Sequence, residues 1–331
     1  MTHKTIHFII IGSGNIANTY FSAIKNLKQA EVVGLVSQKT TKSEKFSQLP
    51  AFKTLQDVNI HFDAVIICTP NGYHHISAIE AAKLGKHVLC EKPIDITLDA
   101  IDKMINSCKT SGVKLAVAYQ RRYSSDNPIV KSLIEKGLLG NIFSVDLSVK
   151  NYRDANYYNS ADYRGTYKID GGGPFIQQAS HYIDLYYWFF GKPSKLTSKL
   201  GTFVHDIEVE DHGAAICLHD SGMIGTITAS TATKPGFPAK MEIYTNKGYL
   251  ILENDVITQW EIEGLENPSE QLQNKNTHTG AASASVEDTT NHELIIKDFI
   301  DAIHLNRTPL ISGESARNAT EIILDIYKNQ F

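Results

Sequence analysis

The sequence lacks the features by which membrane, secreted and nucleic-acid-binding proteins are commonly recognised. Among its 331 residues, no run approaches the roughly 20 consecutive apolar residues of a membrane-spanning helix. The amino terminus enters a short apolar strand without a cleavage signal. No block of lysine and arginine stands out, and the net charge of −4 comes from interspersed charges. We therefore expect an untargeted cytoplasmic protein that binds neither nucleic acid nor a membrane.

Cysteine is also scarce and shows no C-x-x-C spacing. The four cysteines are Cys68, Cys90, Cys108 and Cys217, and three of them lie in or beside apolar runs, as buried free thiols do. No cluster of histidines, cysteines and carboxylates has the spacing of a metal site. The pattern predicts reduced thiols, as in the cytoplasm, and no bound metal.

Hydrophobic residues, by contrast, are plentiful. They make up 42% of the chain, more than one core usually absorbs at this length, which predicts two domains. Apolar strands and helical segments alternate strictly in the first part of the chain. The expected strands span 6–11, 32–37, 63–69, 87–90 and 114–119, and the expected helices span 15–28, 73–85 and 98–112. This alternation is typical of an α/β domain with a doubly wound parallel sheet, which we place at residues 1–120.

The pattern changes after residue 120. One helix ends at 137–140, and the segments NIFSVDLSVKNY and GMIGTITASTAT then alternate in polarity, as half-exposed antiparallel strands do. A Ser/Thr/Asn/Gly-rich stretch at 267–291 is typical of a surface loop, and two helices are expected near 292–305 and 314–329. We therefore predict an α+β domain with an open, largely antiparallel sheet at residues 121–331.

The segment IIIGSGNIANTYFSAI has the G-x-G-x-x-A pattern between an expected strand and an expected helix. Gly12 permits a tight turn, Gly14 lets the backbone approach a pyrophosphate, and Ala17 lets helix and strand pack closely. The exposed amides of Asn15 and Ile16 at the helix start offer hydrogen bonds to the anion. An ordinary strand-to-helix turn is the alternative, but the position in the first βαβ unit favours a dinucleotide site.

The end of the second strand bears on the choice between NAD and NADP. A site selective for NAD normally carries an acidic residue about 20 residues after the first glycine, whereas this chain has Ser37, Gln38 and Lys39. A hydroxyl and a cation suit a 2′-phosphate better, so we favour NADP over NAD. In the alternative interpretation, Lys39 is solvated and Ser37 or Gln38 binds an unphosphorylated ribose.

Four further motifs follow in order: CTPNGYHH at 68–75, CEKP at 90–93, YQRRY at 119–123 and DGGGPFIQQASHYID at 170–184. Together they resemble the Gfo/Idh/MocA oxidoreductases, the family of glucose-fructose oxidoreductase and inositol dehydrogenase. The resemblance covers nearly the whole chain. It implies an N-terminal Rossmann domain and a C-terminal domain whose sheet supports the substrate pocket. It also implies a homo-oligomer, a dimer or tetramer, formed through that sheet.

In this family the lysine of E-K-P lies beside the nicotinamide and the reacting hydroxyl, so the resemblance implies a catalytic Lys92. Pro93, often cis in the family, would fix its approach, and Glu91 would lie near the nicotinamide ribose. Ligands also bind at the carboxyl edge of a doubly wound sheet; a solvated loop lysine is the alternative. The cofactor contacts implied at these strand ends are Thr69, Pro70, Asn71, His74, Glu91 and Lys92.

The fourth motif predicts a helix from Pro174 to Gly191. Gln177, His181 and Asp184 are four and three residues apart, so this helix places them on one face. The resemblance aligns His181 with the family's acid/base histidine; a core histidine among aromatics is the alternative. The best-known members carry an aspartate where this chain has Gln177, which orients a hydroxyl or the imidazole but cannot accept a proton. Asp184 is a further candidate substrate-binding residue, which would orient His181 from the next turn; a structural role, such as capping nearby backbone groups, is the alternative that we favour.

The segment KNYRDANYYNSADYRGTYKID concentrates tyrosines with Arg153 and Arg164. Tyrosines stack on sugar faces, and arginines bind carboxylates or phosphates. Tyr157 and Arg164 are therefore candidate substrate-binding residues, with an interface loop as the alternative. Gln120 and Arg121 resemble family positions at the edge of the pocket.

These residues predict reversible oxidation of a secondary alcohol on a sugar, cyclitol, sugar acid or nucleotide sugar, with NADP or NAD as cofactor. The hydride passes to nicotinamide C4, the hydroxyl proton passes to His181, and Lys92 stabilises the developing alkoxide. One alternative is a regulatory protein that senses a dinucleotide or metabolite without turnover, but the presence of both Lys92 and His181 weighs against it. Another is a hydrolase or epimerase with tightly bound NAD.

Overall fold

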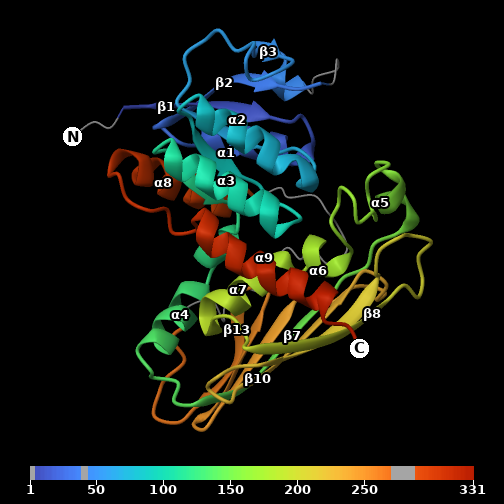
Figure 1. The fold of residues 1–331 in the computed structure, drawn as a ribbon. Coiled ribbons are helices and arrows are strands. Elements are labelled where there is room, and N and C mark those ends of the chain that lie inside the picture. Colours follow the sequence, from blue (N-terminus) through green and yellow to red (C-terminus); the bar gives the residue numbers. More distant parts are fainter. Residues whose placement is uncertain (1–3, 39–43, 270–287) are drawn as a thin grey trace. The chain divides into compact units, whose positions relative to one another are not determined.

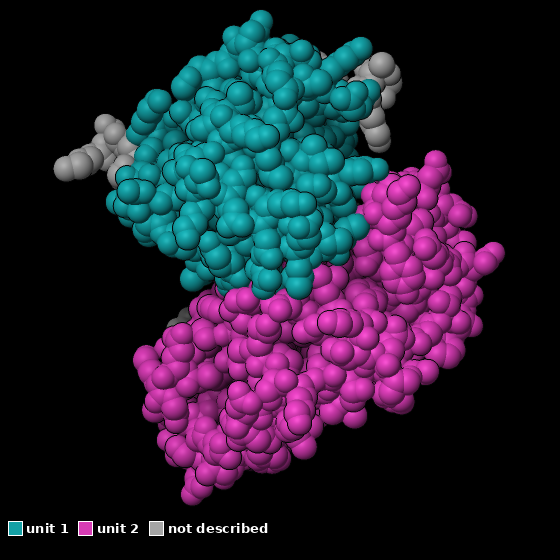
Figure 2. All heavy atoms as spheres, in the orientation of Figure 1, with its two compact units in different colours: residues 1–120, 285–317 teal, residues 121–284, 318–331 magenta. Residues whose placement is uncertain are grey.

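The computed structural model describes residues 4–38, 44–269 and 288–331. These residues fold into two compact units (Figure 2). The first unit contains Met1–Gln120 and Ser285–Arg317, and the second contains Arg121–Ala284 and Asn318–Phe331. Most of the stretch expected as a surface loop lies outside the described residues, as does Lys39. Within the described ranges, no helix is both long and apolar enough to cross a bilayer.

The first unit is an α/β fold built on one parallel sheet (Figure 1). Its strands are β1 (Ile6–Ile11), β2 (Ala30–Val36), β3 (Ala51–Phe52), β4 (Ala64–Ile67), β5 (His87–Cys90) and β6 (Leu115–Val117). Its helices are α1 (Asn15–Lys25), α2 (His74–Lys83), α3 (Leu98–Thr110) and α8 (Thr290–His304), with short 3₁₀ helices η1 (Glu44–Phe46) and η2 (Asn71–Tyr73). A third 3₁₀ helix, η3 (Gln120–Tyr123), begins at Gln120 of this unit, and its other residues belong to the second. The strand order β3-β2-β1-β4-β5-β6 confirms the expected doubly wound sheet.

The order of the strands determines where the helices lie. The connections β1-α1-β2 and β4-α2-β5 extend the sheet in opposite directions, so right-handed crossovers place α1 and α2 on opposite faces. Helix α1 contacts α8, and α2 contacts α3, so both faces are covered. This explains why all four residues of β4 are buried. The strand order reverses between β1 and β4, which is where such sheets bind ligands.

Residues 285–317 return to the first unit, which is therefore larger than the expected range 1–120. Helix α8 packs against α1 and the sheet, and the ring centroids of Phe299 and Phe8 lie 6.4 Å apart. Both side chains are fully buried. Asn26 Nδ2 also donates a hydrogen bond to Glu293 Oε1 at 2.6 Å. The apolar stripe of α8 is buried against this unit, which accounts for the extension.

The second unit contains a seven-stranded mixed sheet. Its strands are β7 (Ile142–Lys150), β8 (Lys195–Gly201), β9 (His212–Leu218), β10 (Ile224–Ser230), β11 (Lys240–Thr245), β12 (Gly248–Glu253) and β13 (Val256–Ile262). Its helices are α4 (Asn127–Glu135), α5 (Ala155–Asn159), α6 (Pro174–Gln177) and α7 (Ser180–Phe190), and α9 (Gly313–Lys328) has residues in both units. The order is β13-β12-β11-β7-β10-β9-β8, with only β7 and β10 parallel, which confirms an open, largely antiparallel sheet.

One face of this sheet is covered by helices. Helix α6 contacts β10 and α7 contacts β7 (Figure 1). A Cβ on Gly225 of β10 would lie 2.0 Å from the Tyr186 hydroxyl, so glycine is needed for α7 to lie this close. On the other face, Ile216, Leu218 and Ile224 are 55%, 41% and 51% exposed. The sheet therefore has one buried face and one open face with apolar side chains.

Candidate active site

The turn after β1 has two glycines with different roles. Gly12 has φ +105°, and a Cβ there would lie 2.6 Å from the Cys68 carbonyl oxygen. A larger residue would therefore clash with the backbone that follows β4. Gly14 is exposed, and a Cβ there would meet nothing within 4 Å. Ala17, on the first turn of α1, is fully buried. Gly12 thus shapes the turn, while Gly14 leaves open space beside the backbone.

Helix α1 begins directly after this turn. Gly14 is the N-cap residue and offers no side chain to the first-turn amides, and the first turn contains no acidic residue. Asn15 is exposed and Ile16 is half-buried. Unsatisfied amides at a helix start and the positive end of the helix dipole favour an anion. These residues fit the pyrophosphate of a dinucleotide, as their sequence pattern predicts.

The end of β2 lies beside the same turn. Ser37 Oγ is 2.8 Å from Ser13 Oγ, and Gln38 Nε2 donates to the Lys53 carbonyl oxygen at 2.8 Å. The described part of this strand end therefore presents hydroxyl groups and no carboxylate. The preference for NADP rests on this composition and on Lys39.

Three neighbouring strands, β1, β4 and β5, end in register at the carboxyl edge of the sheet. Ile11, Ile67 and Cys90 are register partners across β1, β4 and β5. The phosphate-binding turn, Thr69 and Lys92 follow these strand ends, so they leave the sheet at one edge. The structure thus brings the expected cofactor residues of the first unit to one place, and Lys92 is half-buried there.

His74 connects two of these strand ends. Its Nε2 lies 2.9 Å from the Thr69 carbonyl oxygen and its Nδ1 lies 2.9 Å from the Pro93 carbonyl oxygen. The Lys92–Pro93 peptide bond is cis. These contacts link the loop of Thr69 to the loop of Lys92. His74 is 0% exposed, so a bound cofactor cannot touch its side chain. This replaces the expected direct cofactor contact by a positioning role.

Glu91 is buried and bonded on both carboxylate oxygens. The Tyr20 hydroxyl donates to Oε1 at 2.8 Å, and the Lys92 amide donates to Oε2 at 3.0 Å. Burial raises the pKa of Tyr20 well above its usual value, and the neighbouring Glu91 raises it further. Tyr20 therefore remains a hydrogen-bond donor to the carboxylate at neutral pH.

His292 of α8 completes this cluster. Its ring lies 5.3 Å from the Tyr20 ring, edge to face, and its Nε2 lies 3.4 Å from Gln120 Nε2. Burial lowers the pKa of His292, with Glu91 opposing the shift, so the ring is neutral at neutral pH. Tyr20 and His292 were not anticipated from the sequence, because no spacing relates them to Glu91. Gln120, an expected substrate residue, faces His292.

In the second unit, the expected helix from Pro174 to Gly191 is interrupted. Helix α6 ends at Gln177 and α7 begins at Ser180, and the Ala179 amide donates to the Pro174 carbonyl oxygen at 2.8 Å. This bond spans five residues instead of four, so the helical repeat is broken between Gln177 and His181. The prediction of one continuous helical face for these two residues is therefore wrong.

The two polar residues at the break lie in different settings. Gln177 Nε2 donates to the Asp170 carbonyl oxygen at 2.6 Å, which ties the end of α6 to the glycine-rich segment before it. His181 lies on the first turn of α7 and is half-buried. Gln177 thus orders the segment beside His181, and the half-buried imidazole of His181 remains the candidate acid/base of this unit.

Asp184 is not available to a substrate. It is 0% exposed, and its two carboxylate oxygens accept from Arg122 Nε at 2.8 Å and Nη2 at 2.6 Å. Burial raises the pKa of Asp184, and Arg122 opposes the shift. The expected substrate role of Asp184 is corrected to the structural alternative. The sequence placed Asp184 on the helix but gave no indication of its partner.

Arg121 is engaged by two groups of its own unit. It forms an ion pair with Asp255, and its guanidinium lies 4.4 Å from the centroid of the Tyr182 ring. The side chain is 28% exposed. The ion pair and the ring hold Arg121 in one position, and its exposed part remains open to a ligand.

Two arginines surround Tyr157. The guanidinium of Arg164 lies 4.3 Å from the Tyr157 ring centroid and that of Arg153 lies 5.5 Å from it. Gln178 Nε2 donates to the Tyr157 hydroxyl at 3.2 Å. Arg164 Nε is buried and has no hydrogen-bond partner among the described residues. This cationic cluster offers a binding point for a carboxylate or phosphate.

Glu210 supports the glycine-rich segment before α6. It accepts from the Gly173 amide at 3.0 Å and from the Tyr327 hydroxyl at 2.8 Å. Burial raises the pKa of Glu210 to about 7, although these hydrogen bonds oppose the shift. A Cβ on Gly173 would lie 1.9 Å from the Glu210 carbonyl oxygen, so this contact requires glycine. The sequence analysis did not identify Glu210, because it is distant from the motif in the chain.

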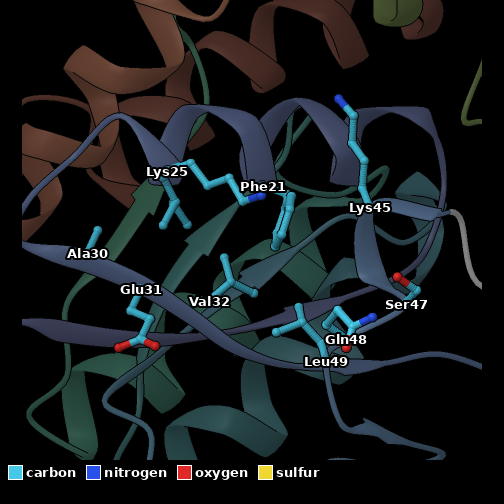
Figure 3. A pocket seen from close by; sticks show the side chains of 10 residues that line it. Phe21, Lys25, Ala30, Glu31, Val32, Lys45, Ser47, Gln48 and Leu49 are labelled. Carbon is cyan, nitrogen blue, oxygen red and sulfur yellow. The ribbon is translucent and has the colours of Figure 1, made fainter.

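A cavity of about 450 Å³ in the first unit lies elsewhere (Figure 3). It is lined by Phe21 and Lys25 of α1, the start of β2 and the segment around Leu49. The start of β2 is at the amino end of the strand, whereas the cofactor turns lie at carboxyl ends. This cavity is therefore separate from the dinucleotide site.

Family models of known proteins match segments of both units. Residues 6–119 match the model of an oxidoreductase family with an NAD-binding Rossmann fold, and residues 129–251 match the model of the GFO/IDH/MocA C-terminal domain.

Individual relatives include dehydrogenases of sugars and cyclitols. The chain is 24% identical to Myo-inositol 2-dehydrogenase of Thermotoga maritima over 323 residues, which cover 94% of this chain and 92% of that protein. A segment of 144 residues is 35% identical to Glucose-6-phosphate 3-dehydrogenase of Bacillus subtilis and spans 43% of this chain, but only 41% of that relative. The solved structure of WlbA dehydrogenase from Bordetella pertussis, in complex with NADH and UDP-GlcNAcA, matches with a TM-score of 0.85 at 27% identity over 98% of this chain and 96% of that one.

Proposed function

Because the chain belongs to the Gfo/Idh/MocA oxidoreductase family, we propose that it is an NAD(P)-dependent dehydrogenase acting on a secondary alcohol of a sugar that carries an anionic group. One observation carries the proposal: β1 and β5 end at the same carboxyl edge of the sheet. The uncapped start of α1 follows β1, and the loop of Lys92 follows β5. A pyrophosphate site and a cationic side chain at one sheet edge suit a nicotinamide dinucleotide and its reaction.

A dinucleotide held by the turn of Gly12 and Gly14 and by the uncapped start of α1 would supply the hydride acceptor or donor, nicotinamide C4. Lys92 donates a hydrogen bond to the reacting hydroxyl oxygen and stabilises the negative charge that develops on it. His181 takes the hydroxyl proton on a ring nitrogen and returns it in the reverse reaction. Gln177 cannot take this proton, since an amide has no acidic or basic group near neutral pH.

The residues around Lys92 fix its position. His74 holds the loops of Thr69 and Pro93 through two carbonyl contacts of 2.9 Å. Glu91 accepts from the Lys92 amide and from Tyr20, which keeps this carboxylate at the strand end. A donor that is already in place does not lose orientational freedom when charge develops on the substrate.

The anionic group of the substrate is assigned to the cluster of Tyr157, Arg153 and Arg164. A planar guanidinium binds a carboxylate or phosphate through two parallel hydrogen bonds, and the tyrosine ring provides a face for a sugar. Glucose 6-phosphate and UDP-GlcNAcA, named for two relatives, both carry such anionic groups. The substrate class is therefore a sugar phosphate, a sugar acid or a nucleotide sugar.

For the cofactor, NADP is favoured over NAD, with Ser37 and Lys39 binding the 2′-phosphate. Relatives differ in this respect, since one structure contains NADH and another relative is named for NADP⁺. Fluorescence titration with NADPH and NADH at matched ionic strength tests the preference. Tighter binding of NADPH that is lost in Lys39→Ala supports the phosphate role, and an unchanged preference refutes it.

The open sheet face is assigned to assembly of a homo-oligomer. Ile216, Leu218 and Ile224 leave an apolar surface on the face that no helix of the described residues covers. Light scattering on Ile224→Glu is expected to show a smaller species than the wild type; unchanged mass would refute this interface. The four cysteines are buried free thiols, which supports a reducing compartment such as the cytoplasm.

The activity is tested with a small substrate panel. The purified chain is incubated with NAD⁺ or NADP⁺ and with UDP-GlcNAcA, glucose 6-phosphate or glucose, while the absorbance of the reduced nicotinamide is followed. We expect kcat/KM to be higher for at least one anionic sugar than for glucose. No reduction with any sugar, or equal kcat/KM for all of them, contradicts the proposal.

Arg164→Leu tests the anion-binding cluster in the same assay. A hydrogen bond to a charged group contributes about 1.5–3 kcal/mol, so KM for the anionic sugar is expected to rise roughly ten- to hundredfold with little change in kcat. KM for a neutral sugar should change little. Arg307→Leu is the control, because Arg307 pairs with Asp298 in the first unit.

A further inference from the structure

A cluster of two histidines and two carboxylates lies at the amino-terminal edge of the first unit's sheet. His7 is the second residue of β1, Glu31 is the second residue of β2, and Asp63 directly precedes β4. His61 lies two residues before Asp63. The dinucleotide turns follow the carboxyl ends of these strands, so the cluster is at the opposite edge of the sheet and takes no part in the proposed reaction.

Sheet register brings these residues together, although they are distant in the sequence. His7 and Glu31 are register partners across β1 and β2. The His7 amide donates to Asp63 Oδ2 at 3.0 Å, and the Asp63 amide donates to the His7 carbonyl oxygen at 2.9 Å. The backbone of the cluster is therefore fixed by the strands.

The side chains converge on one point. His7 Nδ1 lies 3.3 Å from Asp63 Oδ2, and His61 Nε2 lies 3.2 Å from Asp63 Oδ1. One ligand atom from each of these three residues lies within 4.8 Å of the others. Two ligands of a tetrahedral zinc ion, each about 2.0–2.1 Å from the metal, are about 3.3 Å apart. The two histidine–Asp63 separations match that of ligands sharing an ion, and all three donors lie within 4.8 Å of one another.

His7 is oriented as a metal ligand is. Its Nδ1 is buried and makes no hydrogen bond within the described residues. Its Nε2 faces Glu31 Oε2 at 3.6 Å, and Figure 3 shows the Glu31 carboxylate on the other side of β2 from Phe21. At this distance the carboxylate attracts a proton on Nε2 electrostatically, without a direct hydrogen bond, which favours the ring form whose Nδ1 can bind a metal. This explains an otherwise unsatisfied buried nitrogen.

We propose that His7, His61 and Asp63 bind a divalent transition-metal ion of the zinc class, with Glu31 orienting His7. Two imidazoles and one carboxylate are ligands typical of zinc. A neighbouring cavity of about 290 Å³, lined in part by His61 and Asp63, has room for water in the remaining coordination position. Lys4 Nζ lies 3.5 Å from Asp63 Oδ1 and is 69% exposed, so it moves into solvent when the ion binds. The ion would join β1 to the segment before β4. This metal site departs from the expectation, drawn from the sequence, that the chain binds no metal.

The probe is zinc chloride, titrated calorimetrically into the full chain without a histidine tag. We expect a single class of site and a rise in the thermal midpoint of unfolding with zinc concentration. Cobalt chloride is expected to give the visible d–d absorption of a four-coordinate ion. Glu31→Ala should weaken zinc binding roughly ten- to hundredfold, and His61→Ala, which removes a ligand, should weaken it more.

His61 is 63% exposed, so His61→Ala is expected to keep the fold even if changes at His7 do not. His212→Asn in β9 of the second unit is the control and should bind zinc as the wild type does. The four cysteines are buried and do not compete for the ion. Zinc binding that is unchanged in His61→Ala, or lost equally in His212→Asn, overturns the proposal, as does a wild-type chain without zinc affinity. None of these measurements depends on the enzymatic reaction.

Discussion

His74 illustrates how a residue that cannot touch a ligand still contributes to a site. Its two ring nitrogens each lie 2.9 Å from a carbonyl oxygen, one of Thr69 and one of Pro93. The side chain thus links the loop of the expected cofactor residues to the loop of Lys92, and its removal frees both.

We expect His74→Leu to lower kcat by roughly ten- to hundredfold, because a displacement of about 1 Å at a catalytic group has an effect of this size. His74→Asn, which retains a donor, should restore part of the loss. Steady-state kinetics and thermal unfolding are measured on both variants. A lower thermal midpoint with unchanged kcat in His74→Leu would reduce His74 to a purely structural residue.

At this scale the sequence predicted some side chains and not others. Lys92 and His181 stand in local motifs, so their candidacy follows from a few neighbouring letters. Tyr20 and His292 contact or face Glu91 only because α1 and α8 pack together. Long-range packing of this kind leaves no trace in sequence spacing.

At the scale of the element, the turn between β1 and α1 has two glycines that respond differently to a methyl group. Gly12 combines φ +105° with a Cβ clash of 2.6 Å against backbone, whereas a Cβ on Gly14 meets nothing within 4 Å. Gly14 has φ −76°, which any residue adopts.

We expect Gly12→Ala to destabilise the chain by more than about 1 kcal/mol, the usual cost of a left-handed conformation alone. Gly14→Ala should leave the free energy of unfolding nearly unchanged but weaken dinucleotide binding, because its methyl group occupies the approach of the pyrophosphate. Urea unfolding and cofactor titration separate the two effects. Gly85→Ala, with φ +69° and no atom within 4 Å of the added Cβ, is the control for backbone strain without a clash. Wild-type cofactor affinity in Gly14→Ala would refute the pyrophosphate site.

The helix around His181 shows a limit of periodicity. The spacing of Gln177, His181 and Asp184 predicts one face, but the chain closes a wider turn at Ala179 and then restarts as α7. The residues at the break have ordinary helical tendencies, so no local signal marks it. The buried pair of Asp184 with Arg122 likewise depends on tertiary packing.

At the scale of the whole molecule, Glu210 couples stability to pH. Its pKa in the folded chain is about 7, against a usual value of 4.5, because the carboxyl group is buried. The folded state therefore binds more protons than the unfolded state between these values. The stabilising contribution is fully present below about pH 4.5 and is lost as the pH rises through about 7.

We expect the free energy of unfolding of the wild type to fall relative to that of Glu210→Gln by about 3 kcal/mol over this range, at about 1.4 kcal/mol per pKa unit. Urea unfolding of both proteins at several pH values measures the difference. Gln keeps the size of the side chain and an acceptor for the Gly173 amide. Parallel curves for the two proteins would show that Glu210 titrates normally.

The division of the chain was predicted only in part. Alternating apolar strands and helices revealed the doubly wound sheet, because its strands are predominantly apolar and β4 is buried along its whole length. Alternating polarity in β7 revealed the second sheet, because one of its faces is open. The return of residues 285–317 to the first unit was not anticipated, since an amphipathic helix indicates that it packs but not against what.

The most direct test of the proposed dehydrogenase is single-turnover reduction of NAD(P)⁺ by the best sugar of the panel, compared between the wild type and Lys92→Met. We predict a rate about 10²–10³ lower in Lys92→Met, the usual effect of removing one donor that stabilises a developing negative charge. Fluorescence titration should show cofactor affinity close to that of the wild type, and Lys103→Met, at an exposed lysine of α3, should react normally. A wild-type rate in Lys92→Met would contradict the assignment of this lysine to the reacting oxygen.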